Sequence, residues 1–260
     1  MNHNLQLIIE AARILISSRH AISLTGAGVS TPSGIPDFRG SNGLWKKVPP
    51  ELFDITYFIS NPIESWKVFL ELYDSMGEVK PNPAHYSLAR LEEMGVIKAV
   101  ITQNIDGLHQ SAGSKNVIEL HGNLEYAKCI DCGYKISLDQ AIGEARSGQV
   151  PKCPRCGGIM KPDVVFFGEM LPQDNLTRAF DLARASDAIL VVGSSLYVTP
   201  ARYIPGIVKS NGGKVILVNL GDVYPATEFD LIIEMPVEEA LPLLCRKVAE
   251  LLGLEDTGCP

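Results

Sequence analysis

The stretch HAISLTGAGVS, residues 20–30, decides the fold, because it joins a short apolar run to a glycine-rich turn. Residues 20–24 have the character of a buried strand, and the turn at residues 26–30 has the backbone freedom that glycine provides. Comparable apolar runs occur at residues 98–102, 163–167, 188–192, 214–219 and 231–234. Helical patterns occur at residues 5–16, 62–76, 83–94, 175–185, 201–210 and 238–252. Strands that alternate with helices predict an α/β fold, a Rossmann-like, doubly wound parallel sheet covered on both faces.

Four cysteines interrupt this alternation, and they follow the pattern C-x2-C-x20-C-x2-C. They are Cys129, Cys132, Cys153 and Cys156. Each CxxC pair places two thiolates on one tight turn, and two such turns complete the tetrahedral coordination of Zn2+. Four cysteines leave no position for water, so the spacing favours a structural zinc site over a catalytic one. Two redox or disulfide pairs are the alternative.

The position of the cysteines predicts that the zinc-binding part is a small module inserted into the larger domain. We expect residues 1–36, 80–123 and 162–255 to form a discontinuous Rossmann-like domain. Residues 37–79 are expected to form a cofactor-binding loop and the helical part of the small domain. Residues 124–161 are expected to form the zinc-binding module.

Composition and charge exclude several classes of protein. The chain of 260 residues is 46% hydrophobic and 20% charged, which suits a globular protein with a buried core. Its formal net charge of −7 disfavours a protein that mainly holds nucleic acid or anionic lipid. No apolar stretch is long enough for a membrane span, and residues 1–10 lack the features of a secretory signal. We therefore expect a cytoplasmic protein with reduced thiols, in which Cys245 is a small core residue and Cys259, in the tail, has no role.

Small or polar residues follow three of the predicted strands, at Gly26 to Ser30, Gly193 to Ser195, and Asn219. Ligands of doubly wound sheets bind beyond the carboxyl ends of the strands, so these three loops predict a dinucleotide site. The fingerprint of hydride-transferring enzymes, G-x-G-x-x-G, is broken by Thr31. Residues 41–48 also lack the acidic residue that binds the ribose. The pattern favours a dinucleotide that is activated without hydride transfer.

A polar run, TQNID at residues 102–106, follows the strand that begins at Lys98. His121 ends another short extended run and precedes Gly122. The ordinary pKa of histidine suits a general base near neutral pH, although a lone histidine is more often structural. His109 is a comparable candidate on its own. The chain contains no nucleophile elbow, HExxH motif or P-loop.

These motifs, in this order, resemble the signature of the sirtuin family, in its compact prokaryotic form. They are GAGVS at 26–30, GIPDFRG at 34–40, TQNID with Leu108 and His109, His121-Gly122, the two CxxC pairs, FFGE at 166–169, GSS at 193–195 and Val218-Asn219. The resemblance implies an NAD-dependent protein lysine deacetylase with NAD as cofactor and one structural Zn2+ per chain. It also implies an acetylated lysine protein or peptide as partner, bound as an added β-strand, and no nucleic acid or membrane.

The resemblance further implies roles for individual residues, with His121 as general base and Asn104 as a second catalytic residue. The residues expected to bind the cofactor are Gly26, Ala27, Gly28, Ser30, Thr31, Asp37, Phe38, Arg39, Gln103, Asn104, Ile105, Asp106, Gly193, Ser194, Ser195, Asn219, Leu220 and Val237. Those expected to bind the peptide are Val164, Val165, Phe166, Phe167, Gly168, Glu169, Leu196, Tyr197 and Val198. Among these, Asp106 would meet the nicotinamide carboxamide and Phe38 would shield the reacting ribose.

In the reaction that the resemblance implies, the acyl-lysine oxygen attacks C1′ of the ribose as nicotinamide leaves. His121 then acts as general base on the ribose hydroxyls, and the products are free lysine, nicotinamide and 2′-O-acyl-ADP-ribose. Family members that remove succinyl groups carry Tyr-x-x-Arg in the helix after the cofactor loop, but residues 49–81 contain no arginine. An apolar pocket gives a carboxylate no partner, so we expect acetyl or other neutral acyl groups to be preferred.

Tyr197 departs from the family pattern, because relatives often have a smaller apolar residue there. If it faces the peptide, the sequence preference changes; if it faces the core, nothing changes. The main alternative function is an NAD-dependent protein ADP-ribosyltransferase on the same scaffold, which the intact His121-Gly122 and FGE at 167–169 disfavour. A dehydrogenase and a zinc-ribbon protein without catalysis are weaker alternatives, given the broken fingerprint and the acidic charge.

Overall fold

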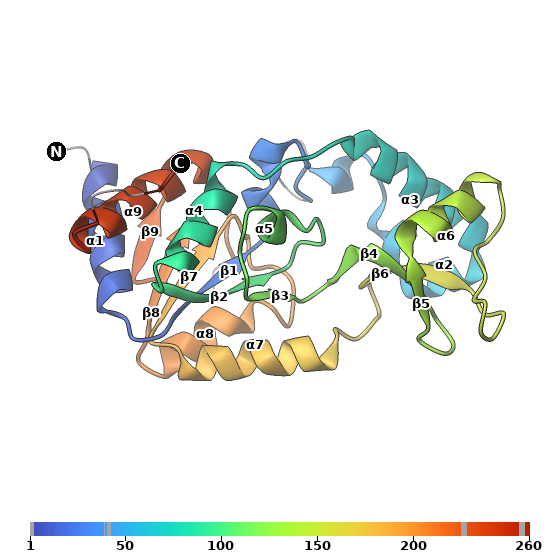
Figure 1. Ribbon diagram of the computed structural model, residues 1–260. Helices are drawn as coiled ribbons and strands as arrows, with labels where there is room; N and C mark the ends of the chain where they lie inside the picture. Colours follow the sequence, from blue (N-terminus) through green and yellow to red (C-terminus); the bar gives the residue numbers. More distant parts are fainter. Residues whose placement is uncertain (1–2, 39, 41–42, 225–227, 255–257) are drawn as a thin grey trace.

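The computed structural model describes residues 3–38, 40, 43–224, 228–254 and 258–260. Its larger part contains a six-stranded, fully parallel sheet with the strand order β3-β2-β1-β7-β8-β9 (Figure 1). The strands are β1 (Ala21–Thr25), β2 (Ile97–Thr102), β3 (Val117–Glu119), β7 (Ala188–Val192), β8 (Lys214–Val218) and β9 (Leu231–Ile233). The predicted Rossmann-like sheet is therefore confirmed. Among the described residues, no helix has both the length and the apolar character to cross a membrane.

Helices cover both faces of this sheet, because its strands are apolar on both sides. The helices of this part are α1 (His3–Ser17), α4 (Pro83–Glu93), α5 (Leu108–Ser111), α7 (Gln173–Ala185), α8 (Tyr203–Ser210) and α9 (Val237–Leu251). Successive residues of a strand face opposite sides. Accordingly Leu190 packs with residues of α1, α4 and α9, whereas Ile189 and Val191 pack with residues of α7 and α8.

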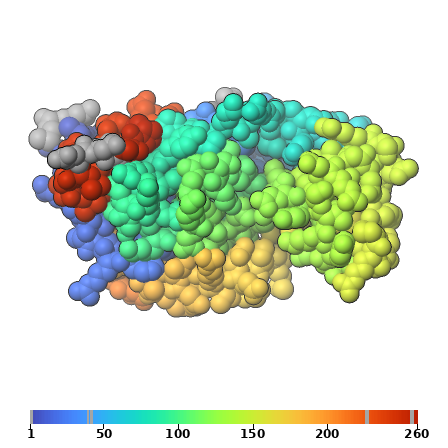
Figure 2. All heavy atoms as spheres, viewed as in Figure 1, coloured from blue at the N-terminus to red at the C-terminus, as the bar shows by residue number. Residues whose placement is uncertain are grey.

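The smaller part is built on a three-stranded antiparallel sheet with the order β5-β4-β6. Its elements are β4 (Gly122–Cys129), β5 (Lys135–Ser137), β6 (Met160–Val164), α2 (Ile55–Ser60), α3 (Pro62–Met76) and α6 (Leu138–Arg146). The Trp66 Nε1–H donates to the carbonyl of Met160 at 3.0 Å, which joins α3 to this sheet. Figures 1 and 2 show this part at the opposite end of the elongated molecule from α1 and α9.

The strand expected at residues 163–167 is wrong in its bounds and in its sheet. The observed strand, β6, ends at Val164 and pairs antiparallel with β4. The following residues contact a different segment, since the Phe167 N–H donates to the Phe53 carbonyl at 2.8 Å and the Ile55 N–H donates to the Phe167 carbonyl at 3.0 Å. A short apolar run shows that a segment is buried, but it does not show which strand becomes its neighbour.

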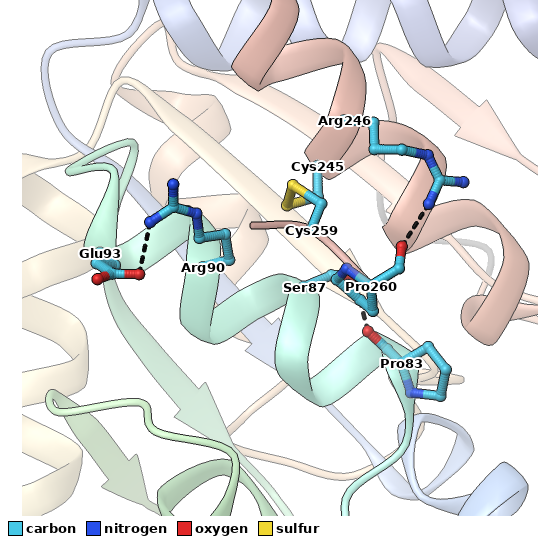
Figure 3. The surroundings of a disulfide bond; sticks show 8 residues. All are labelled: Pro83, Ser87, Arg90, Glu93, Cys245, Arg246, Cys259 and Pro260. Carbon is cyan, nitrogen blue, oxygen red and sulfur yellow. Dashed lines mark hydrogen bonds and ion pairs between the residues drawn. A yellow bond between two sulfur atoms is a disulfide. The ribbon is translucent and has the colours of Figure 1, made fainter. Parts of the chain in front are cut away.

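Cys245 and Cys259 form a disulfide bond, with their Cα atoms 5.9 Å apart (Figure 3). Cys245 is fully buried in α9, as expected for a core residue, but the prediction that Cys259 has no role is wrong. The expectation of reduced thiols is also wrong for this pair, and it holds for the four cysteines of the CxxC pairs. The bond holds the end of the chain against α9 and α4. The carbonyl of Pro260 accepts a hydrogen bond from Arg246, and a Cβ added at Gly258 would lie 2.9 Å from Nε of Arg90. One cysteine in a helix and one in a tail give no pairing signal in a single sequence.

Candidate active site

The carboxyl ends of β1 and β7 lie at the point where the strand order of the large sheet reverses direction, which is where α/β sheets bind ligands. The loop after β1 contacts the loop after β7, and the Gly28 N–H donates to the Gly193 carbonyl at 2.8 Å. A Cβ added at Gly26 or Gly28 would lie 2.8 Å from the same carbonyl oxygen. Glycine is therefore required on this loop. The exposed backbone that results suits the close approach of a pyrophosphate.

A cavity of about 330 Å³ lies between these loops and the small part of the molecule. It brings together residues that the sequence analysis assigns to nicotinamide and to the peptide. Those that line it are Ala27, Ser30, Phe38, Gln103, Asn104, Ile105, Asp106, His121, Val164, Val165, Phe166, Phe167, Glu169 and Val198. The sequence analysis did not assign several apolar residues that also line the cavity, namely Ile35, Leu44, Trp45, Phe53, Phe69, Leu72, Tyr73, Met76, Leu124 and Leu171.

Ser30, Asn104 and Asp106 form one hydrogen-bonded group in this cavity. The Ser30 hydroxyl donates to Oδ2 of Asp106 at 2.7 Å and accepts from Nδ2 of Asn104 at 3.1 Å. Nδ2 of Asn104 also lies 3.2 Å from the carbonyl of Gly26, and Oδ1 of Asp106 accepts from the Leu108 N–H at 3.0 Å. The group thus joins two loops, the one after β1 and the one after β2. Its carboxylate and amide oxygens can pair with a carboxamide of a ligand.

His121 lies between the two sheets, where its imidazole is half-buried and lines the cavity. Its Nδ1 lies 2.8 Å from the carbonyl of Gln103. Because a carbonyl oxygen only accepts, Nδ1 carries the proton and Nε2 is left as the acceptor. Burial lowers the pKa of His121, and the hydrogen bond to Gln103 opposes this effect. The ring is therefore neutral near pH 7, which is the form a general base needs.

The backbone geometry requires a glycine at position 122, directly after His121. Gly122 has a φ of +78°, and a Cβ there would lie 2.0 Å from the carbonyl oxygen of Asp163. β4 and β6 therefore approach each other closely at the point where the chain leaves His121. The close approach is supported by the Val165 N–H, which donates to the His121 carbonyl at 2.8 Å.

His109, the other candidate base, does not line the cavity. It is 1% exposed, and its Nε2 lies 2.9 Å from the hydroxyl of Thr25. The Thr25 hydroxyl donates to Thr102 at 2.8 Å, so it accepts from His109, and Nδ1 has no hydrogen-bond partner in the described chain. Burial, with a smaller contribution from His85, lowers the pKa of His109 to about 3. A ring so enclosed does not contact a substrate, and its role is structural.

His85 is a residue of the site that the sequence analysis missed. It is fully buried at the start of α4, with Nε2 3.4 Å from the Ser30 hydroxyl. Burial lowers its pKa to about 4, and the charge of Asp106 opposes that shift. The residues Asn82 and Pro83 are a signal in the sequence, because asparagine and proline are typical of a helix start. In the structure Asn82 caps α4, and its N–H donates to Nδ1 of His85 at 3.3 Å. That signal indicates a helix start but not its proximity to Ser30.

The residues assigned to the adenosine half lie at the ends of β7 and β8. Ser194 accepts a hydrogen bond from Nε2 of Gln103 at 2.8 Å, which joins the loop after β7 to the loop after β2. Asn219 is 8% exposed, and its Nδ2 donates to the carbonyl of Leu220 at 3.2 Å. Val237 begins α9 and is 6% exposed. The assigned residues that do not line the cavity are Gly26, Gly28, Thr31, Asp37, Gly168, Gly193, Ser194, Ser195, Leu196, Tyr197, Asn219, Leu220 and Val237.

The predicted cofactor loop begins beside the cavity. The Thr31 hydroxyl donates to the Gly28 carbonyl at 3.0 Å, which fixes the turn after β1. Asp37 accepts from the Gly40 N–H at 2.9 Å. The ring of Phe38, 40% exposed, lies 5.1 Å from that of Trp45. Arg39 lies outside the described residues.

Residues 164–169 form one wall of the cavity, and an ion pair between the buried Lys161 and the partly exposed Glu169 holds their shape. Oε2 of Glu169 accepts from the Phe166 N–H at 2.8 Å and lies 3.0 Å from Nζ of Lys161. Lys161 is 5% exposed, and Nζ also donates to the Pro162 carbonyl at 3.0 Å. Burial lowers the pKa of Lys161, and Glu169 opposes this effect. A charge this well enclosed is stable only with these partners, so it fixes the wall.

The facing wall is formed by residues 196–198, whose backbone departs from a regular strand. Leu196 has a φ of +55° and is buried, Tyr197 is 44% exposed, and Val198 lines the cavity. In the described chain, no hydrogen bond uses the Val198 N–H, the Gly168 N–H or the Val165 carbonyl. Both walls therefore present backbone groups that an extended peptide can bind.

The four cysteines of the CxxC pairs lie together at the far end of the small part, with all four Sγ atoms within 4.8 Å of one another. None of them is in a disulfide. The closest Sγ pairs are 3.4, 3.5 and 3.6 Å apart, and four sulfurs at 2.3 Å from a tetrahedral Zn2+ lie about 3.8 Å apart. The donor set and its geometry fit Zn2+. Since all four ligands are thiolates, the site has no position for a substrate.

Comparison with known proteins identifies one family model and similar relatives that cover most of the chain. Residues 26–200 match the model of the Sir2 family. The chain is 51% identical to "NAD-dependent protein deacetylase 1" of Pyrobaculum aerophilum over 243 residues, which are 94% of this chain and 95% of the relative.

Two solved structures are similar over nearly their whole length. One is of Sir2 with a p53 peptide and NAD+, with a TM-score of 0.84 and 45% identity, covering 94% of this chain and 98% of the other. The second is of a Sir2 variant with deacetylated p53 peptide and 3′-O-acetyl-ADP-ribose. Its TM-score is 0.86 at 46% identity, covering 95% of this chain and 98% of the other.

Proposed function

The chain belongs to the Sir2 family, the sirtuins, and we propose that it removes acetyl groups from protein lysines in a reaction that consumes NAD. The observation that carries the proposal is the neutral His121, held by Gln103 at the edge of a cavity that Asp106 also lines. The relative from Pyrobaculum aerophilum has this activity in its name, and the second solved structure holds a deacetylated peptide with an acetyl-ADP-ribose.

His121 is the general base of the proposed reaction. NAD supplies the ribose carbon that the acyl oxygen attacks as nicotinamide leaves. Nε2 of His121 accepts the proton of a ribose hydroxyl, since Nδ1 is held as a donor by Gln103. The resulting imidazolium is stabilised by the same carbonyl. The chain needs no serine or cysteine nucleophile, because the substrate provides the attacking oxygen.

Asp106, Ser30 and Asn104 hold the nicotinamide end in the proposal. Their mutual hydrogen bonds fix the direction of the carboxylate and amide before a ligand arrives, so little order is lost on binding. The glycines at 26 and 28 would admit the pyrophosphate, and Gln103 would contact the nicotinamide ribose. Ser194, Asn219 and Val237 would hold the adenosine half beside the cavity.

The substrate peptide binds in this proposal as a strand between the two walls. The unused hydrogen-bonding groups of Val165, Gly168 and Val198 support this arrangement, because an added strand would satisfy them. The acyl-lysine then enters the cavity between Phe166, Phe167 and Val198, and reaches toward His121. Lys161 and Glu169 keep the first wall in the shape that this requires.

The inner end of the cavity favours a neutral acyl group. Phe69, Leu72, Tyr73 and Met76 of α3 contribute to its lining, and no lysine or arginine is among the described residues that line it. A succinyl carboxylate would lose its hydration there without gaining a cation. We therefore expect acetyl-lysine to be turned over much faster than succinyl-lysine.

Zn2+ stabilises the small part in the proposal and takes no step in the reaction. The division of the chain stays the one that the sequence indicates: residues 1–36, 80–123 and 162–255 for NAD, residues 37–79 for the cofactor loop and helices, and residues 124–161 for the zinc. Its bounds at 123 and 162 fall inside β4 and β6, which both belong to the small sheet. A cytoplasmic location stays a prediction.

Mass spectrometry of the small-molecule products tests the proposed function. The protein is incubated with NAD and an acetyl-lysine peptide, with a succinyl-lysine peptide in parallel. Equal amounts of nicotinamide and O-acetyl-ADP-ribose are expected from the acetyl peptide. Nicotinamide without the acetylated product would instead support ADP-ribosyl transfer, and comparable succinyl turnover would contradict the acyl preference.

A further inference from the structure

A cluster of three tyrosines and an arginine, namely Tyr197, Tyr203, Tyr224 and Arg202, lies at the wall formed by residues 196–198, and no chemical step of the proposed reaction uses it. The rings of Tyr197 and Tyr224 meet edge to face, with centroids 5.7 Å apart. The guanidinium carbon of Arg202 lies 4.3 Å from the centroid of Tyr224 and 5.2 Å from that of Tyr203. The cation is thus held against aromatic surface, while Tyr197 and Tyr203 stay 44% and 50% exposed.

Arg202 has no anionic partner in this arrangement. Among the described residues, no carboxylate forms an ion pair with it and no hydrogen bond uses its guanidinium, although Asp222 is close to Tyr224 in sequence. Stacking uses the face of a guanidinium and leaves its N–H edge able to donate to an acceptor. An arginine already held in place loses less conformational entropy when it binds a carboxylate.

The cluster is joined directly to the wall that would hold the substrate. The Arg202 N–H donates to the carbonyl of Val198 at 3.0 Å, and Val198 lines the cavity. Successive side chains of an extended peptide project to opposite faces. When the acyl-lysine enters the cavity, the residues directly before and after it project outward, on the side where Tyr197 is exposed.

We propose that Arg202, held by Tyr224 and Tyr203 and flanked by Tyr197, selects substrates with an acidic residue directly before or after the acyl-lysine. This inference rests on the proposed deacetylation and on the binding of the peptide as a strand. An acidic residue is proposed because its charge complements that of Arg202. The chain as a whole has a net charge of −7 and does not attract a carboxylate, so a favourable electrostatic interaction requires a local cation. Tyr197 is 44% exposed and so does not face the core, and in this inference it faces the peptide.

Steady-state kinetics with matched peptides test the inference. Three acetyl-lysine peptides carry Glu, Gln or Lys at the position before the acetyl-lysine, and three more carry them at the position after it. The Glu peptide is expected to exceed the Gln peptide by about three- to fivefold in kcat/KM at one of the two positions, which is the range of a partly exposed ion pair. The difference should arise in KM and shrink in 0.5 M salt, because salt screens exposed charges.

Arg202→Gln removes the charge and is expected to abolish the preference for Glu over Gln. Arg202→Lys, which keeps a charge but loses the planar stack, is expected to retain part of it. Arg184→Gln is the matched control, because it makes the same change in net charge at the end of α7, before β7 begins and thus at the edge of the sheet opposite the cavity. It is expected to keep the full preference.

Equal kcat/KM for the Glu and Gln peptides in the unaltered protein would overturn the inference. So would an Arg202→Gln variant that slows all peptides by the same factor, because Arg202 would then only hold Tyr224 in place. Failure of the unaltered protein to deacetylate any of the peptides would instead contradict the proposed function.

Discussion

Replacing Cys259 by serine is expected to lower the free energy of unfolding by about 3 kcal/mol. The disulfide joins cysteines that are 14 residues apart, and closing a loop of about 15 residues in the unfolded chain has an effect of that size. The substitution leaves Cys245 as a small thiol in the core, so it adds no polar group there. For chains of this size, 1 kcal/mol shifts the melting temperature by roughly 2–4 °C, which gives a decrease of roughly 6–12 °C.

Scanning calorimetry with and without a phosphine reductant, which lacks the thiolates that would compete for Zn2+, measures the effect. The reductant should lower the melting temperature of the unaltered protein to that of Cys259→Ser and leave the variant unchanged. Zinc content should stay the same in all four samples, because the four thiolates of the zinc site are not in disulfides. A variant that melts within 2 °C of the unaltered protein, or that responds equally to reductant, would refute the assignment of this stability to the cross-link.

Four shorter predictions concern the site. His121→Ala should abolish deacetylation while NAD binding, measured by calorimetry, persists; retained turnover would remove His121 from its role. The acidic limb of kcat/KM should lie below pH 6.5, because burial lowers the pKa of His121 and the base is lost only as pH falls through that lowered value; a limb above pH 7 would contradict this. Lys161→Met should raise KM for the peptide severalfold with little change in KM for NAD, since it frees the wall that Glu169 holds; an equal rise in both would indicate a general loss of structure. Cys153→Ser should lose Zn2+ and destabilise the small part, because binding energy at such a site is folding energy, and a stable, active, zinc-free variant is the contrary result.

Local signals explain which parts of the molecule can be predicted from its sequence. The strand at residues 188–192 is apolar over its whole length and the strand at residues 214–218 is apolar after Lys214, and only a sheet covered on both faces buries such runs. The zinc cysteines are predictable because each CxxC pair is a complete local turn. In both cases the chemistry lies within a few residues, so no knowledge of distant neighbours is needed.

Features that depend on distant neighbours could not be predicted in the same way. Residues 160–164 pair with β4, across the whole zinc-binding segment, and nothing in their composition distinguishes this partner from the parallel sheet. The bond between Cys245 and Cys259 depends on where the tail ends after α9. The stacking of Arg202 on Tyr224 joins residues separated by a strand and a helix. Each of these contacts is set by the fold as a whole.

Three histidines of the site illustrate why residue type alone does not assign a catalytic role. His85, His109 and His121 all have a lowered pKa, and burial is the first cause for each. Only His121 lines the cavity, and only there does a backbone carbonyl hold Nδ1 as the donor and leave Nε2 to accept a proton. His109 has its Nε2 engaged by Thr25, and His85 lies behind Ser30. The proposed catalytic role therefore follows from the hydrogen-bond partner of each ring and from its access to the cavity. Two of the three histidines, His85 and His109, support the pocket, and His121 is the proposed base.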